Sequence, residues 1–232
     1  MGTQANDLPG VNGFGAPRID ANQRRANYGP QDFDRRHNFN INWVYELPKA
    51  TSNKVFGLAA NGWQISGIYR YQTGAPYNVG FNIPGLSGYG VTGTQQIEGG
   101  RIAVLGNPGT GATSDPYRQF DVTRFTTPGL GSLGLESGRN FLYRPPINAL
   151  DATLQKDFSI KEKARLTLRL DAFNALNHTQ FDGINSTLNV RSLADPTPTN
   201  IASDTAGNRA GFGAVTSVRP PRVMQISLRV QF

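Results

Sequence analysis

Several kinds of residue are missing or scarce in this chain of 232 residues. It has no cysteine, which excludes disulfides and thiolate metal sites. Its only histidines are His37 and His178, which offer little for a metal or catalytic site. Charged residues make up 17%, against about 25% in typical soluble domains, and no apolar run approaches the ~18 residues of a transmembrane helix. These shortages argue against helical bundles, coiled coils and helical membrane proteins.

Signals of enzymatic chemistry are equally poor. The segment 106–113, GNPGTGAT, has the glycine spacing of a phosphate-binding loop, but Ala112 stands where that loop needs a lysine. The chain also lacks the G-x-S-x-G nucleophile motif. We therefore expect no enzyme activity, no cofactor and no metal. The net charge of +7 comes from scattered basic residues, so we expect no nucleic-acid partner either.

What the chain does contain is strict alternation of apolar and polar residues over long stretches. In residues 164–172, for example, alanine and leucine fill the even positions and polar or charged residues fill the odd ones. Alternation with a period of two predicts a β-strand with one apolar and one wet face. Five such strands are predicted, at about 36–48, 62–82, 147–159, 163–181 and 212–232.

The connections between these strands alternate in length. Residues 49–61 and 160–162 are short links, whereas 83–146 and 182–211 are long loops rich in glycine, proline and asparagine. Short turns at one end and long loops at the other are typical of outer-membrane barrels. We therefore predict an all-β fold, an antiparallel transmembrane β-barrel segment. Residues 1–35 are expected to be the remnant of an extracellular loop, and 36–232 the C-terminal part of the barrel.

Aromatic residues gather near the predicted strand ends, as in the two interfacial girdles of such barrels. Phe173 and Phe181 break the pattern because they fall on the polar parity of their strand, so we expect a bulge or register shift near 173–177. The expected girdle by the short turns comprises Tyr45, Trp63, Phe158 and Phe232, and the one nearer the long loops Phe39, Tyr77, Phe81 and Phe181.

Three groups of residues are candidates for function. The last strand ends on an aromatic residue, a pattern that we interpret as a signal for the barrel-assembly machinery, which pairs a free edge strand. Its residues are Met224, Ile226, Leu228, Val230 and Phe232. A tentative lumen set, which would bias passage or only be solvated, is Arg165, Arg169, Asp171 and Arg229. Loop residues that would suit an anionic or sugar ligand are Arg101, Tyr117, Arg118, Arg139, Tyr143 and Arg144.

Five segments resemble, in one order, the C-terminal end of TonB-dependent outer-membrane receptors, in particular the Oar-like group. The most specific are FNALNH at 173–178 and PPRVMQISLRVQF at 220–232. The others are DRRHNFNINWVYELP at 34–48, NGWQISGIYRYQTGAPYNV at 61–79, and GRNFLYRPP at 138–146 with LDATLQKDFSI at 150–160.

The resemblance implies a location in the bacterial cell outer membrane and a share of a barrel of about 22 strands around an N-terminal plug. Such receptors bind a scarce solute, for instance a siderophore or an oligosaccharide, and import it with force from the TonB complex. The expected partners are outer-membrane lipid, the barrel-assembly machinery and, through an N-terminal part that this sequence lacks, TonB. Five strands are too few to close a barrel, so we expect the chain to be a fragment or a split partner.

Two other readings of the residues differ in class. A secreted β-sandwich adhesin or carbohydrate-binding module would show the same alternation along its strands. A basic sheet that stacks single-stranded nucleic acid on its aromatic residues is the third reading. It is disfavoured because the aromatic residues share a face with isoleucine and leucine rather than with arginine.

Overall fold

The computed structural model describes residues 28–85, 101–129, 132, 136–161, 164–192, 194–204 and 207–232. The chain divides into two compact units. The sheet unit comprises residues 36–72, 147–180 and 219–232. The loop unit comprises the described parts of 1–35, 73–146 and 181–218.

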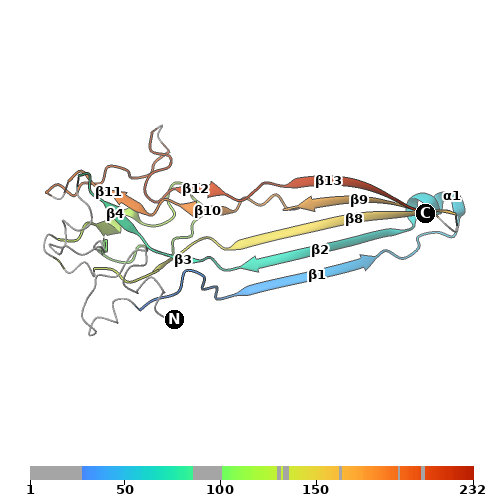
Figure 1. The fold of residues 1–232 in the computed structure, drawn as a ribbon, viewed down its shortest axis with the longest axis horizontal. Coiled ribbons are helices and arrows are strands. Elements are labelled where there is room, and N and C mark those ends of the chain that lie inside the picture. Colours follow the sequence, from blue (N-terminus) through green and yellow to red (C-terminus); the bar gives the residue numbers. More distant parts are fainter. Residues whose placement is uncertain are drawn as a thin grey trace. The chain divides into compact units, whose positions relative to one another are not determined.

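The sheet unit is a single five-stranded antiparallel sheet (Figure 1). Its strands lie in the order β1-β2-β8-β9-β13, so each is hydrogen-bonded to the strand next to it in the predicted series. The sequence-based prediction of five consecutive antiparallel strands is therefore confirmed. The strands are β1 (Asn38–Glu46), β2 (Trp63–Gln72), β8 (Ile147–Lys161), β9 (Ala164–Phe173) and β13 (Val223–Gln231).

The lengths of these strands match a membrane crossing. Four of them have 9 or 10 residues, and β8 has 15. A tilted strand needs about 9–11 residues to span the hydrocarbon core. Strands of soluble sheets are usually shorter, at about 5–6 residues.

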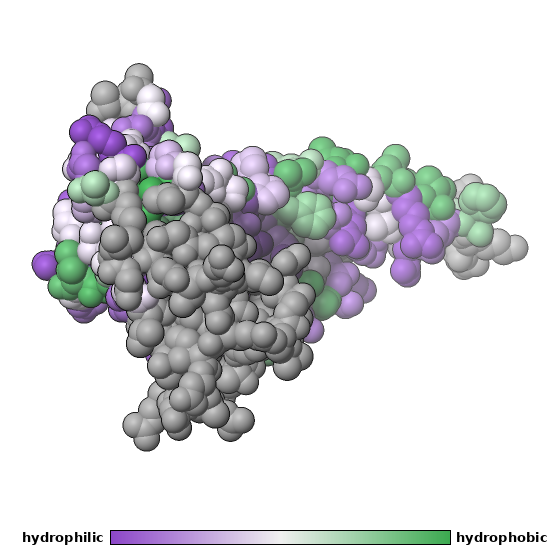
Figure 2. Space-filling view, turned by 60° about the vertical axis from the view of Figure 1, so that its left-hand side comes forward, coloured by the Kyte–Doolittle hydropathy of each residue, from purple (hydrophilic) through white to green (hydrophobic). Residues whose placement is uncertain are grey.

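The register sends most of the large apolar residues of the five strands to one face. One row across the sheet joins Tyr45, Ile65, Leu154, Leu170 and Ile226. In the part of Figure 2 that holds the sheet, hydrophobic and hydrophilic residues form separate bands. Because a slip of one residue would exchange the two faces of a strand, the continuous apolar rows specify this register.

A glycine lets an aromatic ring lie flat on the apolar face. Gly67 is paired with Trp43 across β1 and β2. A Cβ atom at position 67 would lie 2.4 Å from the indole ring of Trp43. Glycine is required here for close approach, and the ring fills the space that a side chain would take.

The apolar face has one charged residue, which the alternation did not reveal. Lys156 shares a row with Trp63, Leu168 and Leu228, yet its side chain is buried. Its ammonium lies 5.3 Å from the Trp63 ring centroid and 5.0 Å from that of Phe158, and it donates to the Asn61 carbonyl. The charge thus reaches past the apolar band to the strand end, as lysine does at membrane interfaces.

The aromatic girdles are partly as predicted. Trp63 and Phe158 lie on the apolar face at the end with the short links, and Phe39 lies there at the opposite end, paired with Tyr71. The predicted assignment of Tyr77 and Phe81 to a girdle is wrong, because Tyr77 is buried in the core of the loop unit and Phe81 packs against that core.

Three of the predicted strands are too long. The structure divides 62–82 into β2, β3 (Pro76–Tyr77) and β4 (Gly80–Asn82), and 212–232 into β12 (Val215–Val218) and β13. Pro220 and Pro221 separate β12 from β13, since proline has no backbone N–H to donate to a sheet. Likewise, 163–181 becomes β9 and the start of β10 (Phe181–Ile184).

The irregularity expected near 173–177 is a turn rather than a bulge. Strand β9 ends at Phe173, and residues 174–176 form the turn. Asn174 and Asn177 have φ angles of 49° and 51° there. Asparagine is one of the few residues that tolerate this left-handed conformation. Phe173 keeps its place on the polar face.

The predicted link 49–61 contains a helix that was not predicted from the sequence. Helix α1 (Lys54–Ala60) is capped by Asn53, whose side chain accepts from the backbone amides of Val55 and Phe56. Within the described part of the chain, no helix is long and apolar enough to cross a membrane.

The long loops are not open chain, as the sequence suggested, but form the loop unit with a hydrophobic core of its own. Its remaining elements are β5 (Ala103–Val104), η3 (Val122–Arg124), β6 (Phe125–Thr126), β7 (Leu142–Tyr143) and β11 (Thr187–Asn189). Short ladders join segments from different loops, such as the parallel pair β4–β11. The core residues are Tyr77, Val79, Ile83, Ile102, Phe120, Phe125, Leu142, Ile184, Leu188, Val190 and Phe212.

An aromatic cluster stands at the centre of this core. The ring centroid of Phe212 lies 5.0 Å from that of Phe120 and 5.5 Å from that of Phe125, both in edge-to-face geometry. Phe212 directly follows the long connection 182–211, whereas Phe120 and Phe125 lie in the long connection 83–146. The cluster therefore ties the two long connections together.

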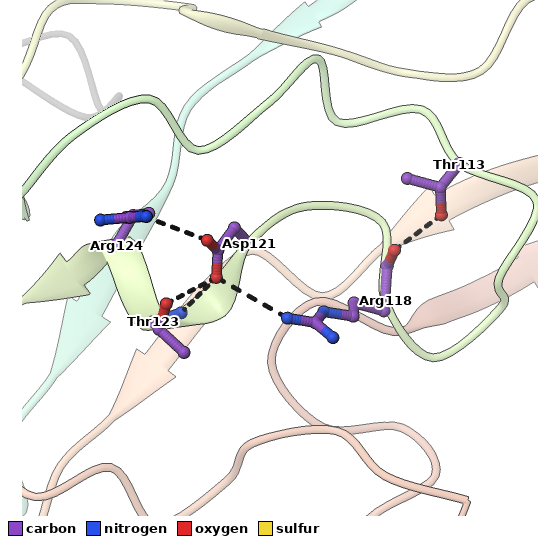
Figure 3. Close-up of polar contacts among 5 residues, drawn as sticks. All are labelled: Thr113, Arg118, Asp121, Thr123 and Arg124. Atoms are coloured by element: carbon purple, nitrogen blue, oxygen red, sulfur yellow. Dashed lines mark hydrogen bonds and ion pairs between the residues drawn. The ribbon is translucent and has the colours of Figure 1, made fainter.

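The carboxylate of Asp121 organises the turn beside this cluster (Figure 3). It accepts from the amide and hydroxyl of Thr123, at 3.1 and 2.6 Å, and pairs with Arg124 at 3.1 Å. These hydrogen bonds, those of Thr123 foremost, hold the pKa of Asp121 below its usual value. A second, longer ion pair joins it to Arg118 at 3.9 Å.

Replacing the central ring of the cluster is expected to open the loop unit. The Phe212→Ala change should cost about 3–5 kcal/mol, because it removes a large buried side chain and leaves a cavity. Since ~1.4 kcal/mol is a factor of ten, proteolytic cleavage within 101–129 should become at least ~100-fold faster in isolated membranes. The matched control is Phe33→Ala, because the Phe33 side chain in the same unit is 79% exposed. Equal cleavage rates for the two variants would contradict the assignment of Phe212 to the core.

Candidate functional site: a polar sheet face and its cleft

The face of the sheet opposite the apolar rows is polar and carries balanced charge. The register places Gln64, Gln155 and Ser227 in one row, and Ser66, Thr153 and Gln225 in the next. Four basic and four acidic side chains share this parity: Arg70, Arg165, Arg169, Arg229, Glu46, Asp151, Asp157 and Asp171. A face of this kind suits contact with water.

Hydrogen bonds between strands organise these charges. The Thr153 hydroxyl of β8 donates to the Asp171 carboxylate of β9 at 2.6 Å, and Arg169 donates to the same carboxylate at 2.8 Å. Two rows farther along the same face, the Thr167 hydroxyl donates to the Asp157 carboxylate at 2.6 Å. The acidic groups are therefore fixed in position rather than free to swing.

All four residues of the tentative lumen set lie on this face. Arg169 and Asp171 are ion-paired at 2.8 Å, so their charges offset each other. Arg165 and Arg229 are exposed and lie opposite Gln231 and Thr167 across β9 and β13. The side chains of these two arginines form no hydrogen bond or ion pair with another described residue, which leaves their charge available to a partner.

The residues interpreted as an assembly signal lie on the apolar face of an edge strand. Strand β13 pairs with β9 on one side, and the described residues supply no partner for its other side. All its residues are exposed, and Phe232 extends beyond the strand end. This edge has the form that strand addition requires.

A cleft of about 420 Å³ opens on the polar face where β9 ends and β13 begins. Its size is within the range of small-molecule sites. The Arg70 guanidinium pairs with Asp151 across its floor at 2.8 Å. The lining residues are Asn38, Asn40, Arg70, Gln72, Ile147, Ala149, Asp151, Phe173, Asn174, Gln180, Arg219, Pro220, Pro221 and Val223.

The turn after β9 builds one wall of the cleft. The Asn174 side chain donates to the carbonyls of His178 and Pro220, at 3.2 and 3.3 Å, and accepts from the His178 amide. Buried Gln180 accepts from the amides of Asn148 and Arg219, through its side chain and backbone respectively. The FNALNH segment thus has a structural role. The sequence did not identify Asn174 and Gln180 as site residues, because each also has partners more than 30 positions away, such as Pro220 and Asn148.

The basic loop residues proposed as ligand contacts are largely occupied in the loop unit. Arg139 is 5% exposed, and Arg101 donates to the Ser137 carbonyl at 3.0 Å. Burial lowers the pKa of both guanidinium groups. Arg144 donates to the Asp182 carbonyl at 2.6 Å and lies 5.7 Å from the Tyr77 ring centroid. These arginines hold the loop unit together, while Tyr117 and Arg118 remain more open.

Metal chemistry finds no support in the described part of the chain, where no three His, Asp or Glu side chains gather in a way that could hold an ion. What the sheet unit offers is one apolar face, one wet face with fixed charges, and a polar cleft.

The match to a protein family accounts for this division. The family described as the outer membrane beta barrel domain matches residues 1–225. The chain belongs to this family. No curated protein and no solved structure matches it. As an outer-membrane β-barrel protein, it resides in the bacterial outer membrane, where its apolar face suits lipid and its polar face suits water.

The turn that walls the cleft can be tested with two substitutions at one position of this barrel protein. Asn174→Ala should lower the free energy of unfolding by about 2–3 kcal/mol, because alanine is strained at positive φ and the side-chain hydrogen bonds are lost. Asn174→Gly should cost about 1 kcal/mol less, since glycine adopts this φ freely. Urea unfolding in lipid vesicles measures both. If the alanine variant is as stable as the glycine variant, the left-handed turn is not formed.

Proposed function

We propose that this protein forms part of the wall of a TonB-dependent outer-membrane receptor, which binds a scarce solute and imports it. The observation that carries the proposal is the cleft on the polar face, bordered by amides and by the Arg70–Asp151 pair. A plain structural barrel needs no such cleft. The resemblance of the five strand segments to the Oar-like group supports the same assignment. In this proposal the protein is a transporter without enzymatic activity or cofactor.

A closed barrel is needed for this function. In lipid, unpaired backbone groups cost several kcal/mol each, so the free edges of β1 and β13 must be paired. Further strands would complete the wall, from a longer polypeptide or from additional chains. The same argument supports recognition of the β13 edge by the barrel-assembly machinery, which pairs strands in this way.

The residue at the end of β13 tests this recognition. Deleting Phe232 should lower the amount of protein in the outer membrane several-fold, because the terminal aromatic residue would be the contact that identifies the strand. Gln231→Ser is the matched control, since Gln231 lies on the polar face opposite Arg165. Quantitative immunoblots of purified outer membranes measure both. Unchanged yield after the deletion would remove Phe232 from the signal.

Dependence on TonB distinguishes a receptor from a passive barrel. Intact cells would be treated with formaldehyde, and complexes captured with an antibody to residues 213–232. We expect a cross-linked species that contains TonB and that disappears in a strain without TonB. The control is a porin of the same membrane, which should give no such species. Absence of the complex, while a known receptor of the same cells forms it, would refute the proposal.

The alternative of a secreted β-sandwich receives less support. A sandwich covers the apolar face of each sheet with a second sheet about 10 Å away. In the described part of the sheet unit no second sheet is present, and side chains such as Ile226 and Leu228 remain more than half exposed. Apolar rows of this extent in five adjacent strands suit a lipid environment better.

A further inference from the structure

Helix α1, in the link 47–62 between β1 and β2, presents its apolar side chains outward. Val55, Phe56 and Leu58 are 80%, 72% and 58% exposed, and no residue of the helix is buried. An exposed apolar cluster on so short a helix would be unfavourable in water. The surface must therefore be covered in the molecule's normal setting.

The opposite side of the helix is fixed to its own link. Asn61 donates to the Thr51 carbonyl and accepts from the Ala50 amide, both at 2.8 Å. Gly57 faces this asparagine, and a Cβ atom there would lie 2.8 Å from its side-chain nitrogen. Hydrogen bonds of Asn61 thus hold the link together on one side of the helix, and the apolar residues point away from that side.

Two further contacts join the helix to the lipid face of the sheet. The indole of Trp63 donates to the Ala59 carbonyl at 2.8 Å, and Lys156 donates to the Asn61 carbonyl. Both Trp63 and Lys156 belong to the apolar rows. The apolar surface of α1 is therefore continuous with the lipid-facing surface of the barrel wall, at the end where the strands stop (Figure 1).

The charge of the link fits the surface of a membrane. Residues 47–63 contain Lys49 and Lys54 and no acidic residue. Both lysines are exposed. Lipid headgroup regions with acidic phosphates attract such basic groups. Basic residues next to aromatic and apolar ones are typical of helices that lie in the plane of an interface.

We propose that α1 is an in-plane lipid anchor, in which Val55, Phe56 and Leu58 insert into the headgroup boundary of the leaflet on the side of the short links. Lys49 meets phospholipid phosphates at the same level. The anchor fixes the β1–β2 link against the membrane and sets the depth of these two strands. It depends on the outer-membrane location of the protein and not on which solute is carried.

The absence of cysteine makes a direct test clean, because an introduced thiol is the only one in the chain. A nitroxide would be attached to Phe56→Cys on the apolar side and, as the matched control, to Lys54→Cys on the other side. The protein is studied in isolated outer membranes and in vesicles of phosphatidylethanolamine and phosphatidylglycerol. Accessibility to oxygen and to a water-soluble nickel chelate gives the depth of each label. The melting temperature of both variants confirms that the barrel is intact.

We expect the label at position 56 to lie about 5–10 Å below the phosphates, with several-fold lower nickel accessibility than the label at position 54. Equal nickel accessibility at the two positions would overturn the proposal. Protection of both labels would also overturn it, because protein rather than lipid would then cover the helix. Spin–spin broadening that grows with protein density would assign the surface to a second copy of the chain instead.

Discussion

The antiparallel hydrogen-bond register of the five strands is the constraint on which the rest of the sheet unit depends. Because side chains alternate, one register places Tyr45, Ile65, Leu154, Leu170 and Ile226 in a single apolar row, and the same register gathers eight charged groups on the other face. A slip of one residue in a strand would turn its charged side chains toward lipid. The lipid face, the polar face and the cleft are thus consequences of one pairing.

Two residues that depart from the alternating pattern have structural roles of their own. Lys156 interrupts the apolar rows and carries its charge to the end of the strands, where it helps to hold α1. Phe173 interrupts the polar face and becomes part of the cleft. Both residues lie toward an end of the five-stranded sheet, and Phe173 is the last residue of β9.

The sequence predicted the number, order and pairing of the strands because period-two alternation is a local signal and the links between strands are read directly along the chain. It overestimated strand length at three places. At two of them the cause is local: Asn174 at positive φ follows the end of β9, and Pro220 and Pro221 separate β12 from β13. It also treated the long connections as open loops. The core of the loop unit joins residues such as Phe120 and Phe212, which are about ninety positions apart. No local sequence pattern predicts such contacts.

By itself the sequence determined that this protein is an all-β outer-membrane barrel protein with one lipid face, because apolar and polar residues alternate at the period of a strand. Tertiary structure alone decided which polar residues are neutralised by partners, where the cleft lies, and that α1 turns its apolar side outward. These features depend on side chains brought together across strands and loops, and such proximity is set by folding of the whole chain rather than by spacing along it.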